Sequence, residues 1–404
     1  MNSRERVLKT LNHQIPDKVP IDFGGMRSTG ITALAYSELK KYLGLNIGEI
    51  RVYDVFQQLA DIEKYFLDLF EVDVVDMMNS FVGIEPGEWK EWILKNGVKA
   101  LIPSNINPEK IDGKYVIRDH TGRIAMEMPE NSLYFDAVNP PLENLKSVKD
   151  IENYSWKYFT DEELKLYERK AKYLFENTNY AIMAGFGGNM LEGPQEIRGW
   201  INYMTDLALG ENFVDELLDK FCDVYLQNLK LFLQAVGKYV QLIQMGDDMG
   251  TQAGPILSPD LYRDKIKPRH KKLYSYIREN SNVYVFLHSC GSIYQLIPDL
   301  IDAGVQVLNP VQTTAKDMDP IRLKNEFGDK LTFWGGGSET QTILLNGSPD
   351  EVDEQVKERM KIFGKGGGYV FCQIHNIQYG VPPKNIIAMF NAAKKYRDYS
   401  FINS

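Results

Sequence analysis

The chain has 404 residues, 44% of them apolar, which is enough to bury a large core as one barrel or as two ordinary domains. Its formal charge of -9, from 46 basic and 55 acidic residues, is spread along the chain, and no basic stripe indicates binding of nucleic acid. The first residues, MNSRERVLKT, lack the apolar stretch of a signal peptide, and no later segment has the unbroken apolar length that spans a bilayer. We therefore expect a cytoplasmic protein without membrane or nucleic-acid partners.

Eight short runs rich in β-branched and aromatic residues alternate with amphipathic helical stretches such as 212–236. This alternation predicts a parallel sheet, and eight is the strand number of a (β/α)8 TIM barrel. We expect residues 1–404 to form a single barrel domain. The predicted strands are 19–23, 72–76, 180–186, 239–246, 283–288, 305–309, 331–334 and 369–372.

Residues 85–144 depart from this alternation. They contain Asn-Gly, Asp-Gly and Thr-Gly pairs, which are typical of hairpin turns, between short strand-like runs. We interpret this stretch as a β-rich insertion after the second strand. Since long loops after barrel strands lie above the C-terminal face of the barrel, we expect the insertion to act as a lid or wall of the site.

Candidate site residues follow the first and third predicted strands, because barrel strands deliver functional residues at their C-terminal ends. After the first, the glycines of FGGMR let the backbone come close to a ligand, and Arg27 is able to pair with an anion. After the third, Phe186 is a predicted substrate contact. Glu192 is a predicted acid or metal ligand, and the alternative is an ordinary glutamate in the first turn of a helix.

The fourth predicted strand ends in the sequence MGDDMG. Asp247 and Asp248 are predicted to bind substrate or to supply a metal ligand at the barrel mouth. The alternative for either one is an aspartate that caps a helix or a turn. Met249, which follows them, is a predicted substrate contact.

A histidine and two cysteines end the fifth and eighth predicted strands. Strand alternation places His288 and Cys290 on the same side of the chain, and Cys372 ends the last run. A His/Cys/Cys set with an open fourth position is typical of a catalytic zinc site, because a structural site fills all four positions. The alternative is that the cysteines are buried packing residues, as we predict for Cys222 inside a helical stretch. The chain has three cysteines, and this odd number also argues against a disulfide framework.

Two aromatic residues complete the predicted substrate contacts. Trp334 precedes a glycine run that lacks the Gly-Lys-Ser/Thr ending of a phosphate-binding loop, so we exclude that function. His375 follows the last predicted strand and is expected to contact substrate or to orient a neighbour. A purely structural histidine is the alternative.

Several stretches resemble the uroporphyrinogen decarboxylase superfamily and, within it, the zinc-dependent corrinoid methyltransferases. They cover much of the chain and are KVPIDFGG, GDDMGTQAGPILSPDLYRDKIKPRHKKLY, HSCG, FWGGGSETQTILLNGSPDEV and HNIQYGVPPKNI. The resemblance implies a (β/α)8 barrel with zinc on an HxC pair and a later cysteine, which match His288, Cys290 and Cys372. The arginine-rich segment with which the decarboxylase binds its tetrapyrrole is absent, since GGMRSTG contains only Arg27. Porphyrinogen decarboxylation is therefore not expected.

The sequence looks more like the first methyltransferases of O-demethylase systems than like the branch that methylates a thiol coenzyme, whose members are shorter and would not need the 85–144 insertion. This resemblance implies that zinc polarises an aromatic methyl ether, whose methyl group moves to the cob(I)alamin of a separate corrinoid protein. Asp247, Asp248 or Glu192 would hold ring substituents or complete the metal shell. Three alternatives stay open: a methylcobalamin:thiol coenzyme methyltransferase, a metal-free decarboxylase-like lyase that uses the two aspartates, and a corrinoid-handling module without activity.

Overall fold

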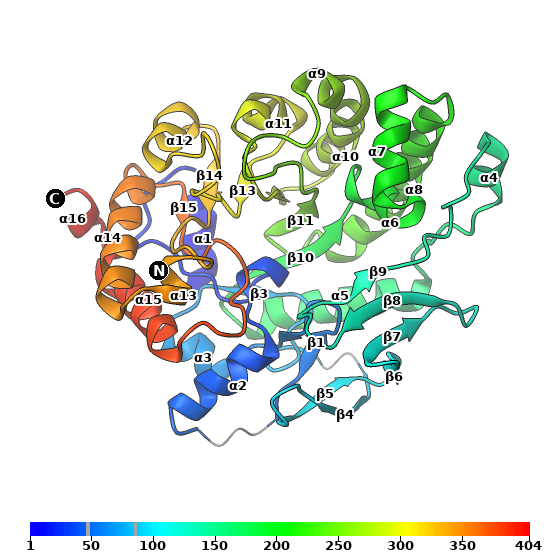
Figure 1. The fold of residues 1–404 in the computed structure, drawn as a ribbon. Helices are drawn as coiled ribbons and strands as arrows, with labels where there is room; N and C mark the ends of the chain where they lie inside the picture. Colours follow the sequence, from blue (N-terminus) through cyan, green and yellow to red (C-terminus); the bar gives the residue numbers. More distant parts are fainter. Residues whose placement is uncertain (46–48, 85–86) are drawn as a thin grey trace.

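Seven parallel strands form the central sheet of the computed structural model, which describes residues 1–45, 49–84 and 87–404. Each strand pairs in parallel with the strands that precede and follow it in the sheet, and helices surround the curled sheet (Figure 1). In order across the sheet the strands are β3 (Val74–Asp76), β10 (Ala181–Gly187), β11 (Leu242–Gly246), β12 (Tyr284–His288), β13 (Val307–Asn309), β14 (Thr332–Trp334) and β15 (Tyr369–Val370).

The eighth position of the ring is filled by residues 19–23, for which we predicted a regular strand. The segment is extended but forms only an isolated bridge, between Ile21 and Phe371. Phe371 N donates to the Pro20 carbonyl at 2.9 Å, and Asp73 N donates to the Ile21 carbonyl at 2.8 Å, so the segment bonds both edges of the sheet. Pro20 has no N–H to give, which interrupts a regular ladder. The predicted barrel is confirmed, and residues 19–23 take the place of its first strand without forming a regular ladder.

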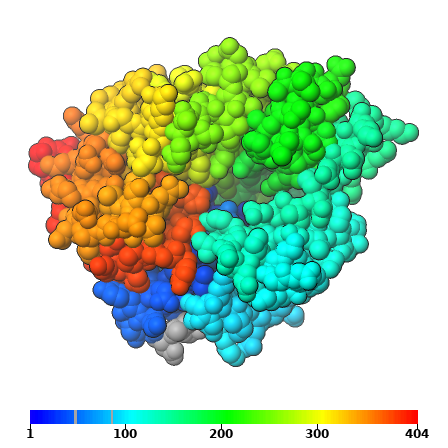
Figure 2. Space-filling view, in the orientation of Figure 1, coloured from blue at the N-terminus to red at the C-terminus, as the bar shows by residue number. Residues whose placement is uncertain are grey.

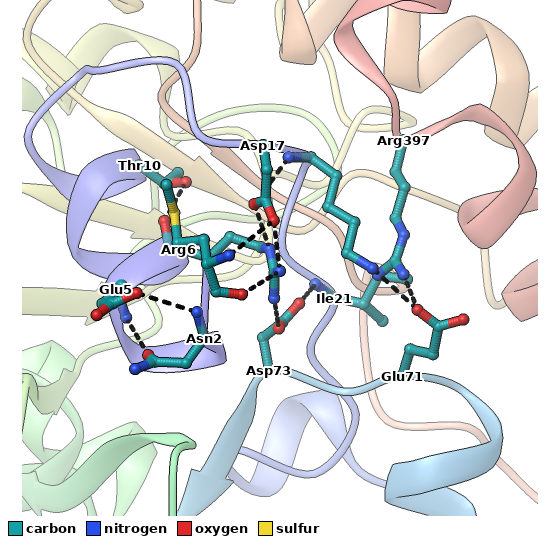
Figure 3. Close-up of polar contacts among 11 residues, drawn as sticks. Asn2, Glu5, Arg6, Thr10, Asp17, Ile21, Glu71, Asp73 and Arg397 are labelled. Atoms are coloured by element: carbon teal, nitrogen blue, oxygen red, sulfur yellow. Dashed lines mark hydrogen bonds and ion pairs between the residues drawn. The ribbon is translucent and has the colours of Figure 1, made fainter.

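Helix α1 (Ser3–Leu11) closes the N-terminal end of the barrel. Val7 and Leu11 are buried in the same interior cluster as residues from every strand of the central sheet, so the helix fills this end of the barrel. Arg6 pairs with Asp73 at 2.5 Å and with Asp17 at 2.7 Å, and Asp73 also accepts the Ile21 N–H at 3.0 Å (Figure 3). Asp17 and Asp73 thereby neutralise the charge of Arg6 at the point where residues 19–23 meet β3.

The longer helices pack around the sheet through an apolar face. In α8 (Phe213–Val236), for example, Leu217, Phe221 and Phe232 are buried at helical spacing. No helix among the described residues is long and apolar enough to cross a membrane. The other helices are α2 (Ala33–Tyr42), α3 (Lys64–Leu69), α4 (Val148–Asn153), α5 (Asp161–Asn177), α6 (Glu192–Arg198), α7 (Trp200–Leu209), α9 (Pro259–Leu261), α10 (Lys267–Asn280), α11 (Ile297–Ala303), α12 (Pro320–Phe327), α13 (Ile343–Asn346), α14 (Pro349–Gly364), α15 (Pro383–Tyr396) and α16 (Tyr399–Ile402).

The predicted insertion after the second strand is β-rich, as expected. Its two small antiparallel sheets lie to one side of the barrel (Figure 1). Asp112 and Gly113 both have positive φ, 47° and 77°, as a type I′ hairpin turn requires. The predicted first residue of the insertion, Glu85, lies outside the described residues. The strands are β4 (Trp89–Ile93), β5 (Lys99–Pro103), β6 (Glu109–Ile111), β7 (Lys114–Arg118), β8 (Ile124–Pro129) and β9 (Asp136–Ala137), and a separate hairpin, β1 (Val52–Asp54) and β2 (Leu59–Ala60), precedes them.

Candidate active site and metal centre

His288, the last residue of β12, is held in one orientation by Asn309, the last residue of β13. The Asn309 amide nitrogen donates to the Trp334 carbonyl at 2.9 Å, which leaves its oxygen to accept from His288 Nδ1 at 2.6 Å. This assignment puts a proton on Nδ1 and leaves Nε2 as the ring nitrogen that can bind a metal. A partner of this kind is typical of a metal-binding histidine.

Three side chains place potential metal ligands close together at the C-terminal end of the strands. The donor atoms of His288, Cys290 and His375 all lie within 4.8 Å of one another, and each residue is half-buried. His288 Nε2 lies 3.4 Å from Cys290 Sγ. Ser28, next to Arg27 in the short 3-10 helix Arg27–Thr29, places its Oγ 3.3 Å from the same nitrogen. The group therefore has the donors of a zinc site with three protein ligands.

Two acidic residues border this group. Asp248 Oδ1 accepts from Cys290 N at 2.8 Å and lies 3.6 Å from His288 Nε2. Glu192, the first residue of α6, accepts with one oxygen, Oε2, from Asp248 N at 3.0 Å and from Asn189 Nδ2 at 2.7 Å. The loops after β10, β11 and β12 are thus joined by hydrogen bonds around the His/Cys group.

Asp247 lies behind the group instead of facing the mouth. Its side chain is fully buried and accepts from the backbone N–H groups of Leu191 and Glu192 at 2.7–2.9 Å. Its Oδ2 also lies 3.0 Å from His270 Nε2 in α10. The carboxylate therefore ties the N-terminus of α6, which carries Glu192, to the helix layer, and we infer a positioning function in place of the predicted catalytic one.

Burial and neighbouring charges shift the pKa values of the residues in and around the His/Cys group. Burial, followed by the charges of Asp248 and Asp247, raises the pKa of Glu192 to about 8. Burial, followed by Asp248 and Glu192, raises the pKa of the Cys290 thiol. Burial, followed by His288, lowers the pKa of His375 to about 4, so this imidazole is neutral at pH 7. A neutral His375 imidazole and a thiol beside two acidic residues fit a divalent cation, whose charge would favour the thiolate.

The structure does not bring Cys372, the predicted third ligand, into this group. Cys372 is fully buried in the packed interior of the barrel, and burial raises the pKa of its thiol. The chain leaves the ring only after this residue, where the Gln373 amide donates to the Thr29 carbonyl at 2.7 Å. His375, which we predicted as a substrate contact, lies at the position expected for the cysteine.

Three predicted substrate contacts lie in packed regions. Trp334 is fully buried inside the barrel, where its Nε1 donates to Asp22 Oδ2 at 2.8 Å. Met249 is 2% exposed in the main core. Phe186 packs against rings on the helix side of β10, with its centroid 5.6 Å from that of Phe232. These environments favour packing functions for all three.

Arg27 does lie at the mouth, beside Ser28. Its Nε is 2.8 Å from Asp54 Oδ2, and its side chain is 62% exposed. Several neighbours were not predicted from the sequence, although Asp76 and Asn309 end predicted strands and share the inward register of His288. Because strand side chains alternate between the two faces, the sequence could have predicted that Asp76 and Asn309 share this face. Asp54 and Ser28 had no comparable signal, because they lie outside the predicted strands.

The loop that carries Cys290 lies in close backbone contact with the loop that carries Asp248. Gly291 has φ +84°, and a Cβ at this position would overlap the backbone of Gly250. We expect Gly291→Ala to separate the two loops and to weaken metal binding at least about tenfold, while the barrel remains folded. Zinc titration and circular dichroism test this. The matched control is Gly254→Ala, where a Cβ meets nothing within 4 Å; equal affinity in both variants would contradict the prediction.

Comparisons with known proteins agree with this fold. The family profile of uroporphyrinogen decarboxylase (URO-D) matches residues 188–396. Methylcobamide:CoM methyltransferase MtaA of Methanosarcina barkeri is 26% identical over 212 residues, which are 51% of this chain and 57% of that protein. Uroporphyrinogen decarboxylase of Pseudoalteromonas atlantica is 27% identical over 185 residues, 45% of this chain and 47% of its own.

The aligned regions span about half the length of both relatives. Among solved structures, a methyltransferase from Methanosarcina mazei superposes with a TM-score of 0.62 at 16% identity, covering 98% of this chain and 99% of the other. This superposition shows the same fold over nearly the whole chain.

Proposed function

This chain belongs to the uroporphyrinogen decarboxylase family, and from that premise we propose that it is a methyltransferase that works with a corrinoid protein. The observation that carries the proposal is the His288, Cys290 and His375 group, with the first imidazole oriented by Asn309. The similarity to MtaA supports the corrinoid partner. A porphyrinogen carries many carboxylates, which the acidic mouth would repel, so the geometry favours methyl transfer over decarboxylation.

We further propose that the methyl donor is an aromatic methyl ether. The methyl group would move from the ether oxygen, which keeps the bonding electron pair, to the reduced cobalt of the partner's corrinoid. Zinc on His288, Cys290 and His375 would act as a Lewis acid toward that oxygen. Cytoplasmic location, as the sequence predicts, is part of the same proposal.

Glu192 is the residue best placed to hold a proton near the leaving oxygen. With a pKa of about 8 it is mostly neutral at pH 7. Its Oε2 already accepts two N–H groups, so the proton belongs on Oε1. We propose that this proton neutralises the departing phenolate. Asp248 orients the Cys290 loop through its bond to Cys290 N.

The insertion is proposed to form a wall over the site. Tyr134, between β8 and β9, donates its hydroxyl to Asn376 Oδ1 at 3.2 Å, and Asn376 is next to His375. The space-filling view is hollowed near the centre, between the cyan and teal insertion and an orange-red segment (Figure 2). Exchanging residues 89–137 for a short linker is expected to change donor preference while zinc remains bound. An unchanged preference would contradict a wall function.

A second candidate, transfer from methylcobalamin to a thiol coenzyme, is favoured by one observation, the similarity to MtaA. In that reaction the metal would bind and activate the thiolate acceptor.

One anaerobic experiment separates the candidates. The zinc-loaded protein is mixed with reduced cobalamin and 2-methoxyphenol, and methylcobalamin is followed by its absorbance. We expect methylcobalamin to form, and Glu192→Gln to slow its formation about 100-fold, as loss of a general acid does. If no methylcobalamin forms while methylcobalamin methylates a thiol, the second candidate is correct. If neither reaction occurs, the proposed function is wrong.

A further inference from the structure

A second polar cluster lies at the barrel mouth, next to the His/Cys group. Its members are Arg27, Tyr53, Asp54, Asp76 and Glu196. Arg27 adjoins Ser28, which contacts His288, and Glu196 lies one turn after Glu192 on α6. Asp76 ends β3 with the inward register of the other site residues. Gln57 links this cluster to the His375 loop, since its N–H donates to Asp54 Oδ1 at 2.9 Å and its side-chain oxygen accepts from Asn376 at 3.0 Å.

The cluster contains a hydroxyl without a partner. Among the described residues, the buried Tyr53 hydroxyl has no hydrogen-bond partner. Burial and then the charges of Asp76 and Asp54 raise its pKa, whereas the charge of Arg27 lowers it, so these charged groups lie near the hydroxyl. A buried hydroxyl left unbonded costs free energy. The hydroxyl therefore points to a ligand that would bond to it.

The charge balance of the cluster is acidic. Arg27 faces Asp54, Asp76 and Glu196, whose charges raise the pKa of the guanidinium, Asp54 most strongly. Since the side chain of Asp54 is 1% exposed and pairs with Arg27, this pair is already neutral. Burial raises the pKa of Asp76 to about 7 and that of Glu196 above its usual value, and it outweighs the opposing charges of Arg27 on both groups and of Lys170 on Asp76.

We propose that this cluster is a subsite that binds an uncharged hydroxyl group on the ring of the methyl donor and rejects a ring carboxylate. A phenolic hydroxyl can donate to Asp76 or Glu196 and accept from Tyr53, so the unpartnered Tyr53 hydroxyl and one of the two carboxyl groups each gain a partner. A carboxylate can only accept a hydrogen bond, and it would meet the acidic groups of Asp76 and Glu196. The inference rests on the proposed function, because the ring it describes is that of the methyl donor.

Equilibrium binding tests the subsite without methyl transfer. The zinc-loaded protein is titrated, in the absence of cobalamin, with 2-methoxyphenol, 2-methoxybenzoate and 2-methoxybenzylamine, which carry a neutral, an anionic and a cationic group. We expect the phenol to bind at least about tenfold more tightly than the benzoate. Tighter or equal binding of the benzoate would overturn the proposal, and so would tightest binding of the amine.

Two variants locate the subsite. Tyr53→Phe is expected to weaken binding of the phenol about fivefold or more with little effect on the benzoate, and Asp76→Asn is expected to reduce the preference for phenol over benzoate. The matched control is Tyr284→Phe, whose hydroxyl bonds to Asn12 at the opposite end of the barrel. If both variants bind all three compounds as the wild type does, the subsite is wrong. If the binding pattern holds and no methylcobalamin forms with cobalamin present, the subsite stands and the proposed function fails.

Discussion

Cys290→Ala and His375→Ala are each expected to lower the affinity for zinc by more than about 100-fold. Each variant loses a direct metal ligand, which costs more than the 10–100-fold effect of losing a residue that only hydrogen-bonds to a ligand. Asn309→Ala, which removes the hydrogen bond to His288 Nδ1, is expected to fall within that smaller range. Competition of the purified protein with a chromophoric chelator measures these affinities. The wild type is expected to bind about one zinc ion per chain.

Cys372→Ala is the informative comparison for this series. Its thiol lies in the packed interior of the barrel and not within the 4.8 Å group, so we expect zinc affinity close to that of the wild type, with lower stability. Cys222→Ala in α8 is a second cysteine control. If Cys372→Ala loses zinc as completely as His375→Ala does, and remains folded, Cys372 is the third ligand, as the sequence predicts.

Asp247→Ala is expected to reduce the free energy of unfolding by about 4 kcal/mol. The substitution leaves the N–H groups of Leu191 and Glu192 and the His270 ring without a buried acceptor, and each unsatisfied buried group costs about 1–3 kcal/mol. The N-terminus of α6 also loses a compensating negative charge. Urea denaturation at constant pH measures the loss.

The neighbouring aspartate is the matched control for this prediction. Asp248 has a side chain that is 39% exposed and accepts one backbone N–H, so Asp248→Ala is expected to cost about 1 kcal/mol. The same variant is expected to affect the His/Cys group more than the fold. Equal losses of stability in the two variants would show that burial of Asp247 does not decide its function.

The sequence by itself determined the barrel and the side of it on which the site lies. Strand runs alternating with amphipathic helices predict a parallel sheet, and His288 and Cys290 share one face because strand side chains repeat every two residues. Both features depend only on neighbours along the chain. The β-rich insertion was predicted for the same reason, since hairpin turns such as Asp112-Gly113 need residues that adopt positive φ.

The tertiary structure decided which inward-facing residues meet and which are buried. The two-residue repeat of strand side chains predicts that Cys372 and Trp334 face the barrel axis, but it does not give their position along that axis. Both lie in the packed interior, whereas His375 reaches the mouth because the chain leaves the ring after Cys372. The burial of Asp247 under α6 likewise depends on His270, 23 residues away in the sequence. Such contacts follow from how strands are staggered and loops fold over the barrel, which no local pattern encodes.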